Sequence, residues 1–209
     1  MSSSRAVRAR LRARFDRAHF VRFPAVLDPD LLEIVSREIE RSEFYERTHE
    51  GIGANKELCM RNRSTAGGLL HVLLNGDELF RMIEEITRSG PIGCFSGRVY
   101  RVVPGCGHRD AWHADVGEHR LVAMSINLSP TPFAGGILEI RDRRSGRIIR
   151  RVRNTGFGDA GLFRISTKLE HRITDVEGTA AKTAFAGWFQ SEPTFRSMVA
   201  GARGAGGRV

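Results

Sequence analysis

Seven short segments between residues 92 and 190 constrain the fold of this chain more than any other feature. They are separated by turn residues, and many are rich in Val, Ile, Phe and Thr; they cover residues 92–103, 119–129, 136–142, 147–153, 160–165, 170–176 and 181–190. Short strands at this spacing are typical of an antiparallel sandwich or barrel. The second half of the chain is therefore predicted to be a β core.

The first ninety residues have a helical period instead. Residues 5–17 are predicted to form a basic helix, and 19–24 a strand. Asp28 caps a helix predicted over 29–41, whose apolar residues recur on one face. Two short helices are expected over 68–74 and 77–88, split by an Asn-Gly pair. The predicted fold class is α+β, mainly β, with N-terminal helices packed on the β core.

A length of 209 residues predicts one domain. We expect that domain to span residues 1–198, with helical support over 1–90 and the β core over 91–190. The glycine-rich end of the chain, residues 199–209, is predicted to be a flexible tail. Nothing in the pattern fixes the oligomeric state.

The composition is that of an ordinary soluble domain, with 41% hydrophobic and 27% charged residues. No apolar run approaches the roughly 20 residues of a spanning helix, so no membrane partner is expected. The basic start leads into no apolar segment of a secretory signal. Three widely spaced cysteines suggest reduced thiols, and a cytoplasmic location is expected.

The chain carries a formal net charge of +9, and only Lys56, Lys168 and Lys182 of its 33 basic residues are lysines. Arginines gather over residues 5–22 and 141–153. One interpretation is a surface for an anionic partner, such as nucleic acid or an acidic protein. The other is an Arg-biased composition on solvated faces. We favour the second, because neither cluster is interleaved with aromatic residues or accompanied by a nucleic-acid motif.

The string Trp112-His113-Ala114-Asp115 is the first that points to chemistry. In an extended segment, residues two apart point to the same face, so His113 and Asp115 can hold one metal ion together. His171, on a later predicted strand, is the best placed third ligand. Two imidazoles and one carboxylate on one face leave open positions on an octahedral ion, which is the arrangement of non-haem Fe(II) oxygenases.

A second His-x-Asp pair, His108 and Asp110, lies five residues upstream. The string PGCG at 104–107 is typical of a turn, which puts this pair in a loop rather than on a strand. The later strings of the sequence also fit His113 and Asp115 better. We therefore favour His113, Asp115 and His171 as the metal ligands and the catalytic centre.

Residues 92–190 resemble the 2-oxoglutarate/Fe(II) dioxygenases, in particular their prolyl-4-hydroxylase-like branch. The matching strings come in order: VPG at 103–105, HAD at 113–115, SINLS at 125–129, FAGGILE at 133–139, GLFR at 161–164, EHR at 170–172 and KTAFAGWF at 182–189. The resemblance implies a double-stranded β-helix (jelly roll). It implies Fe(II), 2-oxoglutarate as cosubstrate, support by ascorbate, and hydroxylation of a C–H bond with release of succinate and CO₂.

The resemblance also implies a cation, about ten residues after the distal His, that binds the far carboxylate of 2-oxoglutarate. Lys182 stands eleven residues after His171 (182 − 171 = 11). Tyrosines often hold the cosubstrate in this branch, and the corresponding positions are Val103 and Asn127; Asn127 is expected to bind it by a hydrogen bond. Tyr100 is an odd number of residues from Val103, so the two are expected on opposite strand faces.

Three further expectations concern the surroundings of the metal. Arg120 follows the ligand pair where related enzymes present a substrate-binding Arg; a solvated loop residue is the alternative. Trp112 and Trp188 are interpreted as core aromatics. Related halogenases replace the carboxylate ligand with a small residue, so Asp115 favours hydroxylation.

The expected substrate is a free amino acid, a peptide or protein side chain, or a small metabolite, selected by a variable lid over residues 43–65. Two alternatives stay open. The first is an oxygenase that acts on nucleic acid through its arginines. The second is a jelly-roll module that binds a metal or a small acid without turnover.

Overall fold

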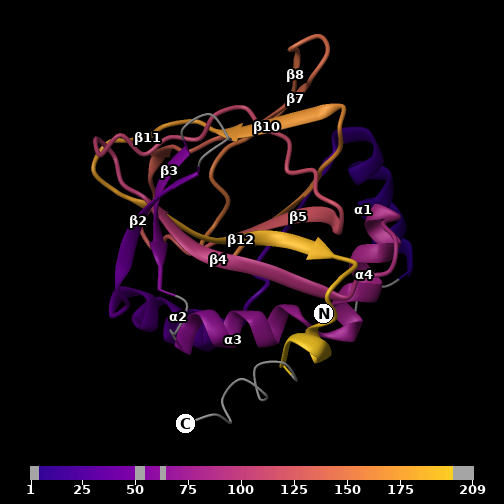
Figure 1. Ribbon diagram of the computed structural model, residues 1–209, viewed down its shortest axis with the longest axis horizontal. Coiled ribbons are helices and arrows are strands. Elements are labelled where there is room, and N and C mark those ends of the chain that lie inside the picture. The colour runs from indigo at the N-terminus through magenta and orange to yellow at the C-terminus, as the bar shows by residue number, and fades with distance from the viewer. Residues whose placement is uncertain (1–4, 50–54, 62–64, 200–209) are drawn as a thin grey trace.

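The computed structural model describes residues 5–49, 55–61 and 65–199, and a seven-stranded antiparallel sheet runs through its centre (Figure 1). We call it the major sheet. Its strands, in spatial order, are β1 (Phe20–Phe23), β9 (Ala160–Arg164), β5 (Arg120–Asn127), β12 (Lys182–Gln190), β4 (Cys94–Val102), β3 (Asn55–Met60) and β2 (Phe44–His49). The central strand β12 pairs with β4 on one side and with β5 on the other, so residues far apart in sequence are neighbours there.

A second, minor sheet faces the major one. It has the order β10 (Leu169–Ile173), β7 (Leu138–Asp142) and β8 (Ile148–Val152), and a two-stranded ribbon pairs β11 (Val176–Glu177) with β6 (Ala134–Gly135). Figure 1 shows the minor sheet on one side of the major sheet and helices α2 and α3 on the other. Each of the seven predicted β segments overlaps at least one strand, which confirms the predicted β core.

The helices cover the outer face of the major sheet. They are α1 (Arg5–Ala18), α2 (Pro29–Glu40), α3 (Thr65–Leu74) and α4 (Asp77–Thr87). Helix α2 begins where predicted, because the Asp28 side chain accepts a hydrogen bond from the backbone N–H of Asp30. Its buried face packs into the main core with those of α3 and α4; this core includes Leu32, Val35, Ile39, Leu70, Ile83, Ile86, Phe95, Phe185 and Phe189.

Alternation along β12 assigns its side chains to two different environments. Phe185 and Phe189 point to the helices, where both rings contact Phe95 at centroid distances of 5.6 and 4.9 Å. Lys182 and Trp188 point the other way, into the space between the sheets, because residues an even number apart share a face. Strand β12 therefore packs against the main core with one face and lines a cavity with the other.

The first ninety residues also contribute to the major sheet, through β1, β2 and β3. The hairpin of β2 and β3 was not predicted; its polar sequence gives no strand period. The division into 1–90 and 91–190 stays a prediction, and residues 200–209 of the predicted tail lie outside the described residues. None of the helices in the described part of the chain is long and apolar enough to cross a bilayer. The cysteines are free, with Cys59 and Cys94 buried and Cys106 exposed.

Candidate metal centre

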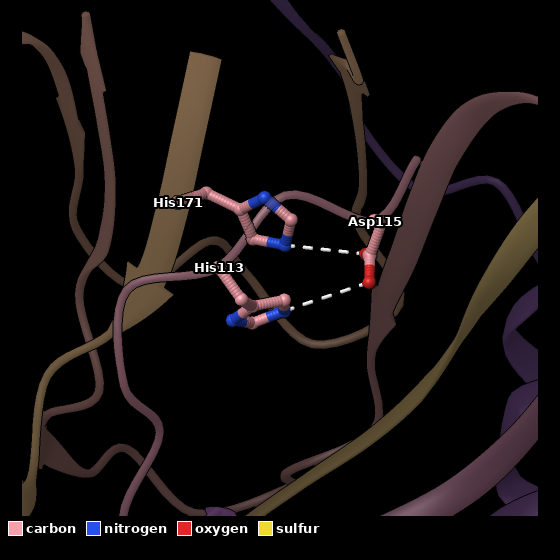
Figure 2. A group of neighbouring side chains, drawn as sticks. All are labelled: His113, Asp115 and His171. Atoms are coloured by element: carbon pink, nitrogen blue, oxygen red, sulfur yellow. Dashed lines mark ion pairs between the residues drawn. The ribbon is translucent and has the colours of Figure 1, made fainter. Parts of the chain in front are cut away.

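His113, Asp115 and His171 lie together between the two sheets (Figure 2). The Nε2 atom of His113 is 3.6 Å from Asp115 Oδ1, and Nε2 of His171 is 3.3 Å from Asp115 Oδ2. One ligand atom from each of the three residues lies within 4.8 Å of the others. Within the described residues this is the one group of three or more His, Cys, Asp or Glu side chains arranged to hold a metal ion.

The backbone brings the two histidines together. His171 lies in β10, and His113 forms an isolated antiparallel bridge to it, with N–H to O=C bonds of 3.0 and 2.8 Å in the two directions. The Nδ1 atom of His113 is 2.7 Å from the carbonyl oxygen of Ala111. Because a carbonyl only accepts, Nδ1 carries the proton and Nε2 keeps its lone pair for a metal.

Asp115 is held by a neighbour that sequence reasoning assigned to the core. The indole Nε1 of Trp188 donates a hydrogen bond of 2.8 Å to Asp115 Oδ2. Trp188 packs against the smaller apolar cluster, as its interpretation as a core aromatic implied, and it is also a partner of the carboxylate, which that interpretation did not include. The signal was present in the sequence, because Trp188 is six residues from Lys182 and so shares its strand face.

The electrostatics of the centre favour an ionised Asp115. Burial by itself raises the pKa of this carboxyl, but the hydrogen bond and charge of His171, the charge of His113 and the Trp188 indole outweigh it and lower the pKa to about 2. Two imidazole nitrogens and an ionised carboxylate form a donor set that suits Fe(II) or another divalent ion of the first transition row. The residues present therefore fit such an ion.

Arg120 lies against the same carboxylate. Its guanidinium stacks on the Trp188 ring at 3.6 Å from the centroid, and Nη1 is 3.8 Å from Asp115 Oδ1. It also donates a hydrogen bond of 3.3 Å to the Asp115 backbone oxygen. The structure thus places Arg120 at the cavity wall beside the metal ligands.

Lys182 lies at another point of the same cavity. Its side chain is 9% exposed, and Nζ donates a hydrogen bond of 3.2 Å to the carbonyl of Gly136. Within the described residues no carboxylate lies within ion-pair distance of Nζ. Burial lowers the pKa of this ammonium group to about 8, against a smaller opposing effect of Asp110. A buried cation without an anionic partner is costly, and a ligand carboxylate would offset the cost.

The cavity that joins Lys182 to the metal ligands has a volume of about 320 Å³. Tyr100 and Val102 line it, whereas Val103 lies beyond the end of β4 and does not. Because Val103 follows the last residue of β4, its expected placement on the strand face opposite Tyr100 stays a prediction, and it is Tyr100 that lines the cavity. Tyr100 was set aside in the sequence because the string VPG aligned Val103 with the expected tyrosine.

Asn127 also lines the cavity, but its amide is engaged elsewhere. Its Nδ2 donates to the carbonyls of Thr155 (2.7 Å) and Gly156 (3.2 Å), and its Oδ1 accepts from the N–H of Ser129 at 3.0 Å. Its hydrogen-bond donors are therefore used to hold the loop before β9. Cosubstrate binding by Asn127 stays a prediction that these contacts do not favour.

The upstream pair accepts hydrogen bonds from backbone groups, and the Asp110 carboxylate also lies beside the centre, with Oδ1 3.4 Å from Nδ1 of His113. His108 accepts a hydrogen bond of 2.9 Å from the N–H of Val103, and Asp110 accepts one of 2.7 Å from the N–H of Ile173. The expected difference between strand and loop does not separate the two pairs, since His113 forms only an isolated bridge and Arg109 forms one too. The partners of the side chains separate them.

Trp112, interpreted from the sequence as a core aromatic, belongs to neither of the two apolar clusters. Its ring lies between the guanidinium groups of Arg141 and Arg172, at 4.2 and 4.6 Å from the centroid. These arginines form ion pairs with Glu170 and Glu139. The aromatic ring therefore belongs to a charged network on the minor sheet.

Comparison with known families decides the identity of the β core. Residues 97–190 match the model of the 2OG-Fe(II) oxygenase superfamily. This β core belongs to the 2OG-Fe(II) oxygenase superfamily. The match includes all three residues of the candidate metal centre and Lys182. Among curated protein sequences, no match to the chain was found.

Solved structures share the fold of this oxygenase core and its helices. An oxidoreductase of the 2OG-Fe(II) oxygenase family from Burkholderia pseudomallei is 14% identical, with a TM-score of 0.70 over 93% of this chain and 95% of the other. A Pseudomonas putida prolyl-4-hydroxylase is 18% identical, with a TM-score of 0.65 over 89% of this chain and 100% of the other. A non-heme alpha-ketoglutarate dependent epimerase from nogalamycin biosynthesis is 14% identical, with a TM-score of 0.62 over 88% of this chain and 82% of the other. The fold is the double-stranded β-helix, as predicted.

Proposed function

We propose that this chain is a 2-oxoglutarate- and O₂-dependent Fe(II) dioxygenase that hydroxylates a C–H bond and releases succinate and CO₂. The observation that carries this proposal is that the three candidate metal ligands and a buried lysine line the same cavity. His113, Asp115 and His171 offer three metal ligands, and Lys182 offers a buried cation with no carboxylate partner among the described residues. A dicarboxylate that chelates a metal through its keto-acid end requires both.

Each residue then has a distinct task. The two Nε2 atoms and the Asp115 carboxylate hold Fe(II), which when bound supplies the one-electron chemistry that activates O₂. The Trp188 indole and the Ala111 carbonyl orient Asp115 and His113, which fixes where the metal sits. Lys182 holds the far carboxylate of 2-oxoglutarate, and the Tyr100 side chain forms part of the wall beside it. Ascorbate is expected to keep the iron reduced.

Hydroxylation is the reaction that we propose, because Asp115 occupies the carboxylate position that halogenases give up. One protein of similar fold is a non-heme alpha-ketoglutarate dependent epimerase, so a scaffold of this kind also serves a reaction other than hydroxylation. The substrate that we propose is an amino acid, a peptide or protein side chain, or a small metabolite. The hairpin of β2 and β3 supports a selecting role for the predicted lid, since Arg47, Lys56 and Glu57 line the cavity. Residues 50–54 and 62–64 of that lid lie outside the described residues.

The arginine cluster at 141–153 gives limited support to an oxygenase that acts on nucleic acid. Arg141 and Arg143 pair with Glu170, and Arg151 pairs with the buried Glu139. These charges are partly neutralised within the minor sheet, which lowers the field available for a polyanion.

Succinate formation tests the proposal against a module that only binds. Purified protein with Fe(II), ascorbate and 2-oxoglutarate in air is expected to release succinate slowly without a primary substrate. Asp115→Ala is the matched inactive variant, since it removes one ligand. Tight binding of metal and 2-oxoglutarate with no succinate above the Asp115→Ala level would identify a binding module and refute the proposal.

A further inference from the structure

Arg98 is a cation inside the cavity that the proposed reaction does not use. It lies in β4, and its side chain lines the cavity. Its Nη1 atom is buried and has no hydrogen-bond partner. In the described part of the chain, six buried side-chain nitrogen or oxygen atoms lack a partner, and Nη1 of Arg98 is the one whose residue lines this cavity. Among the residues that the structure describes, Arg98 also has no ion-pair partner.

The strand register separates Arg98 from the cosubstrate anchor. Val102 pairs with Lys182 across β4 and β12, whereas Arg98 pairs with Ala186. Four residues along a strand span about 13 Å. The two cations therefore stand at different points of one wall, and a carboxylate held by Lys182 is not the natural partner of Arg98.

The cavity that Arg98 lines also carries other basic residues. Arg47, Lys56, Arg109 and Arg120 line the cavity too. Lys56 is neutralised by Glu46 at 2.8 Å, and Arg120 lies 3.8 Å from the Asp115 carboxylate. The acidic residues of the wall are Glu57, Asp110 and Asp115. Glu57 and Asp110 have partners of their own, and Nη1 of Arg98 is a buried donor with no acceptor among the described residues.

Such an arrangement costs folding free energy, because a buried guanidinium donor loses its water without gaining an acceptor. Buried donors left open in this way are typical of sites where a ligand supplies the acceptor. The guanidinium fork matches the oxygens of a carboxylate or a phosphate group, which can accept two parallel hydrogen bonds.

We infer that Arg98 binds an oxyanion group of the primary substrate, so that the substrate is an organic acid or a phosphorylated compound; this rests on the proposed function. The anion pairs with Arg98 while 2-oxoglutarate occupies Lys182. The charge of Arg120, on the other side of β12, attracts the same anionic molecule toward the metal. A substrate that offers no acceptor at this point would leave the Arg98 donor buried and unpaired in the complex as well.

The test uses the full chain loaded with Mn(II) and saturated with 2-oxoglutarate. Inorganic phosphate and acetate serve as the two probes, and relaxation of the ³¹P and methyl ¹H signals by Mn(II) reports binding close to the metal. We expect the wild type to bind at least one probe and Arg98→Met to weaken that binding by about tenfold or more. The probe that binds distinguishes a phosphate from a carboxylate. Arg144→Met, at an exposed arginine of the β7–β8 turn, is the matched control and is expected to change nothing.

Two further readouts separate recognition from a structural role. The Tm of Arg98→Met is expected to equal or exceed that of the wild type, because an unsatisfied donor is removed. Arg98→Lys, which keeps the charge, is expected to retain part of the probe affinity. Equal probe affinity in the wild type and Arg98→Met would overturn the inference. So would a marked fall in Tm, or a loss of 2-oxoglutarate affinity as large as that of Lys182→Met, since Arg98 would then be structural or a cosubstrate contact.

Failure of the proposed function has a different signature. In that case the wild type forms no succinate from 2-oxoglutarate, while the dependence of phosphate or acetate binding on Arg98 is still measured directly.

Discussion

The backbones of His113 and His171 are hydrogen-bonded to one another in both directions, at 3.0 and 2.8 Å. A pair of this kind in an antiparallel ladder fixes the separation and direction of the two side chains. Residues 58 positions apart (171 − 113 = 58) are thereby held so that their rings lie 4.3 Å apart, centroid to centroid, with both Nε2 atoms toward Asp115.

His171→Ala is expected to lower the affinity for Fe(II) or Mn(II) by more than about 100-fold, because one of three ligands is lost and the backbone bridge alone binds no metal. Anaerobic titration calorimetry measures the dissociation constant. His108→Ala is the control, since this histidine bonds to the Val103 N–H and not to the centre. Retained metal affinity in His171→Ala would remove His171 from the ligand set.

Trp188→Phe is expected to weaken metal binding by about 10–100-fold, the usual effect of losing a hydrogen bond to a metal ligand. The phenyl ring keeps the stacking surface for Arg120 but cannot donate to Asp115 Oδ2. Mn(II) titration followed by EPR gives the affinity. Trp112→Phe, at the ring between two arginines of the minor sheet, should behave as the wild type. Equal affinities in the two variants would mean that the indole bond does not stabilise the bound metal.

Binding of 2-oxoglutarate is expected to weaken about tenfold between pH 7 and pH 9. Burial holds the pKa of Lys182 at about 8 before the ligand binds, and the bound carboxylate restores the charged form, so binding takes up a proton above that pH. Quenching of tryptophan fluorescence in the Mn(II) protein measures the dissociation constant. Lys182→Arg should bind with little dependence on pH in this range, because a guanidinium stays charged. A flat profile in the wild type would contradict this role of Lys182.

The same shift in pKa affects stability without ligand. The pKa of Lys182 is lower in the folded chain than its ordinary value of 10.5, so the unfolded chain binds more protons between about pH 8 and pH 10.5. The contribution of Lys182 to the free energy of unfolding therefore rises with pH across this window. Lys182→Met should remove that rise in urea titrations, and an unchanged pH dependence would argue against the burial of a charged amine.

Asp159→Asn is expected to lower the free energy of unfolding by about 2 kcal/mol near neutral pH. The buried carboxylate pairs with Arg22 and accepts hydrogen bonds from the N–H groups of Ala25 (2.9 Å) and Gly156 (2.8 Å), which ties β1 to the loop before β9. Burial raises the pKa of Asp159, but these partners outweigh it, so the pKa lies below the ordinary value of 3.8.

The stabilisation by Asp159 is present above that ordinary value and is lost as the pH falls through the lower folded pKa. The difference between the wild type and Asp159→Asn in urea unfolding should therefore shrink in acid. Glu118→Gln, at a side chain that is 88% exposed, is expected to change stability by less than about 0.5 kcal/mol. An equally small effect of Asp159→Asn would show that the carboxylate adds little to the strand pairing with β9 and the apolar contacts that hold β1.

Lys182 was predicted from the resemblance to a known family. Local spacing in the sequence was enough to predict the β core, the helix after Asp28 and the grouping of His113 with Asp115. Each of these depends on a period of two or 3.6 residues, or on a cap, which the backbone itself dictates. The eleven residues from His171 to Lys182 lead from β10 of the minor sheet, through β11, to β12 of the major sheet.

Only the tertiary structure decided which side chains meet. The registers of β4 and β12 put Tyr100 rather than Val103 in the cavity, brought Trp188 to Asp115, 73 residues away, and left Arg98 without an acceptor. The physical reason is that register is set by all the pairings of a sheet at once, and a shift of one residue would turn every side chain to the other face. The sequence determined the chemical groups and the faces of each strand; the pairing and packing of the sheets determined which of those groups share a site.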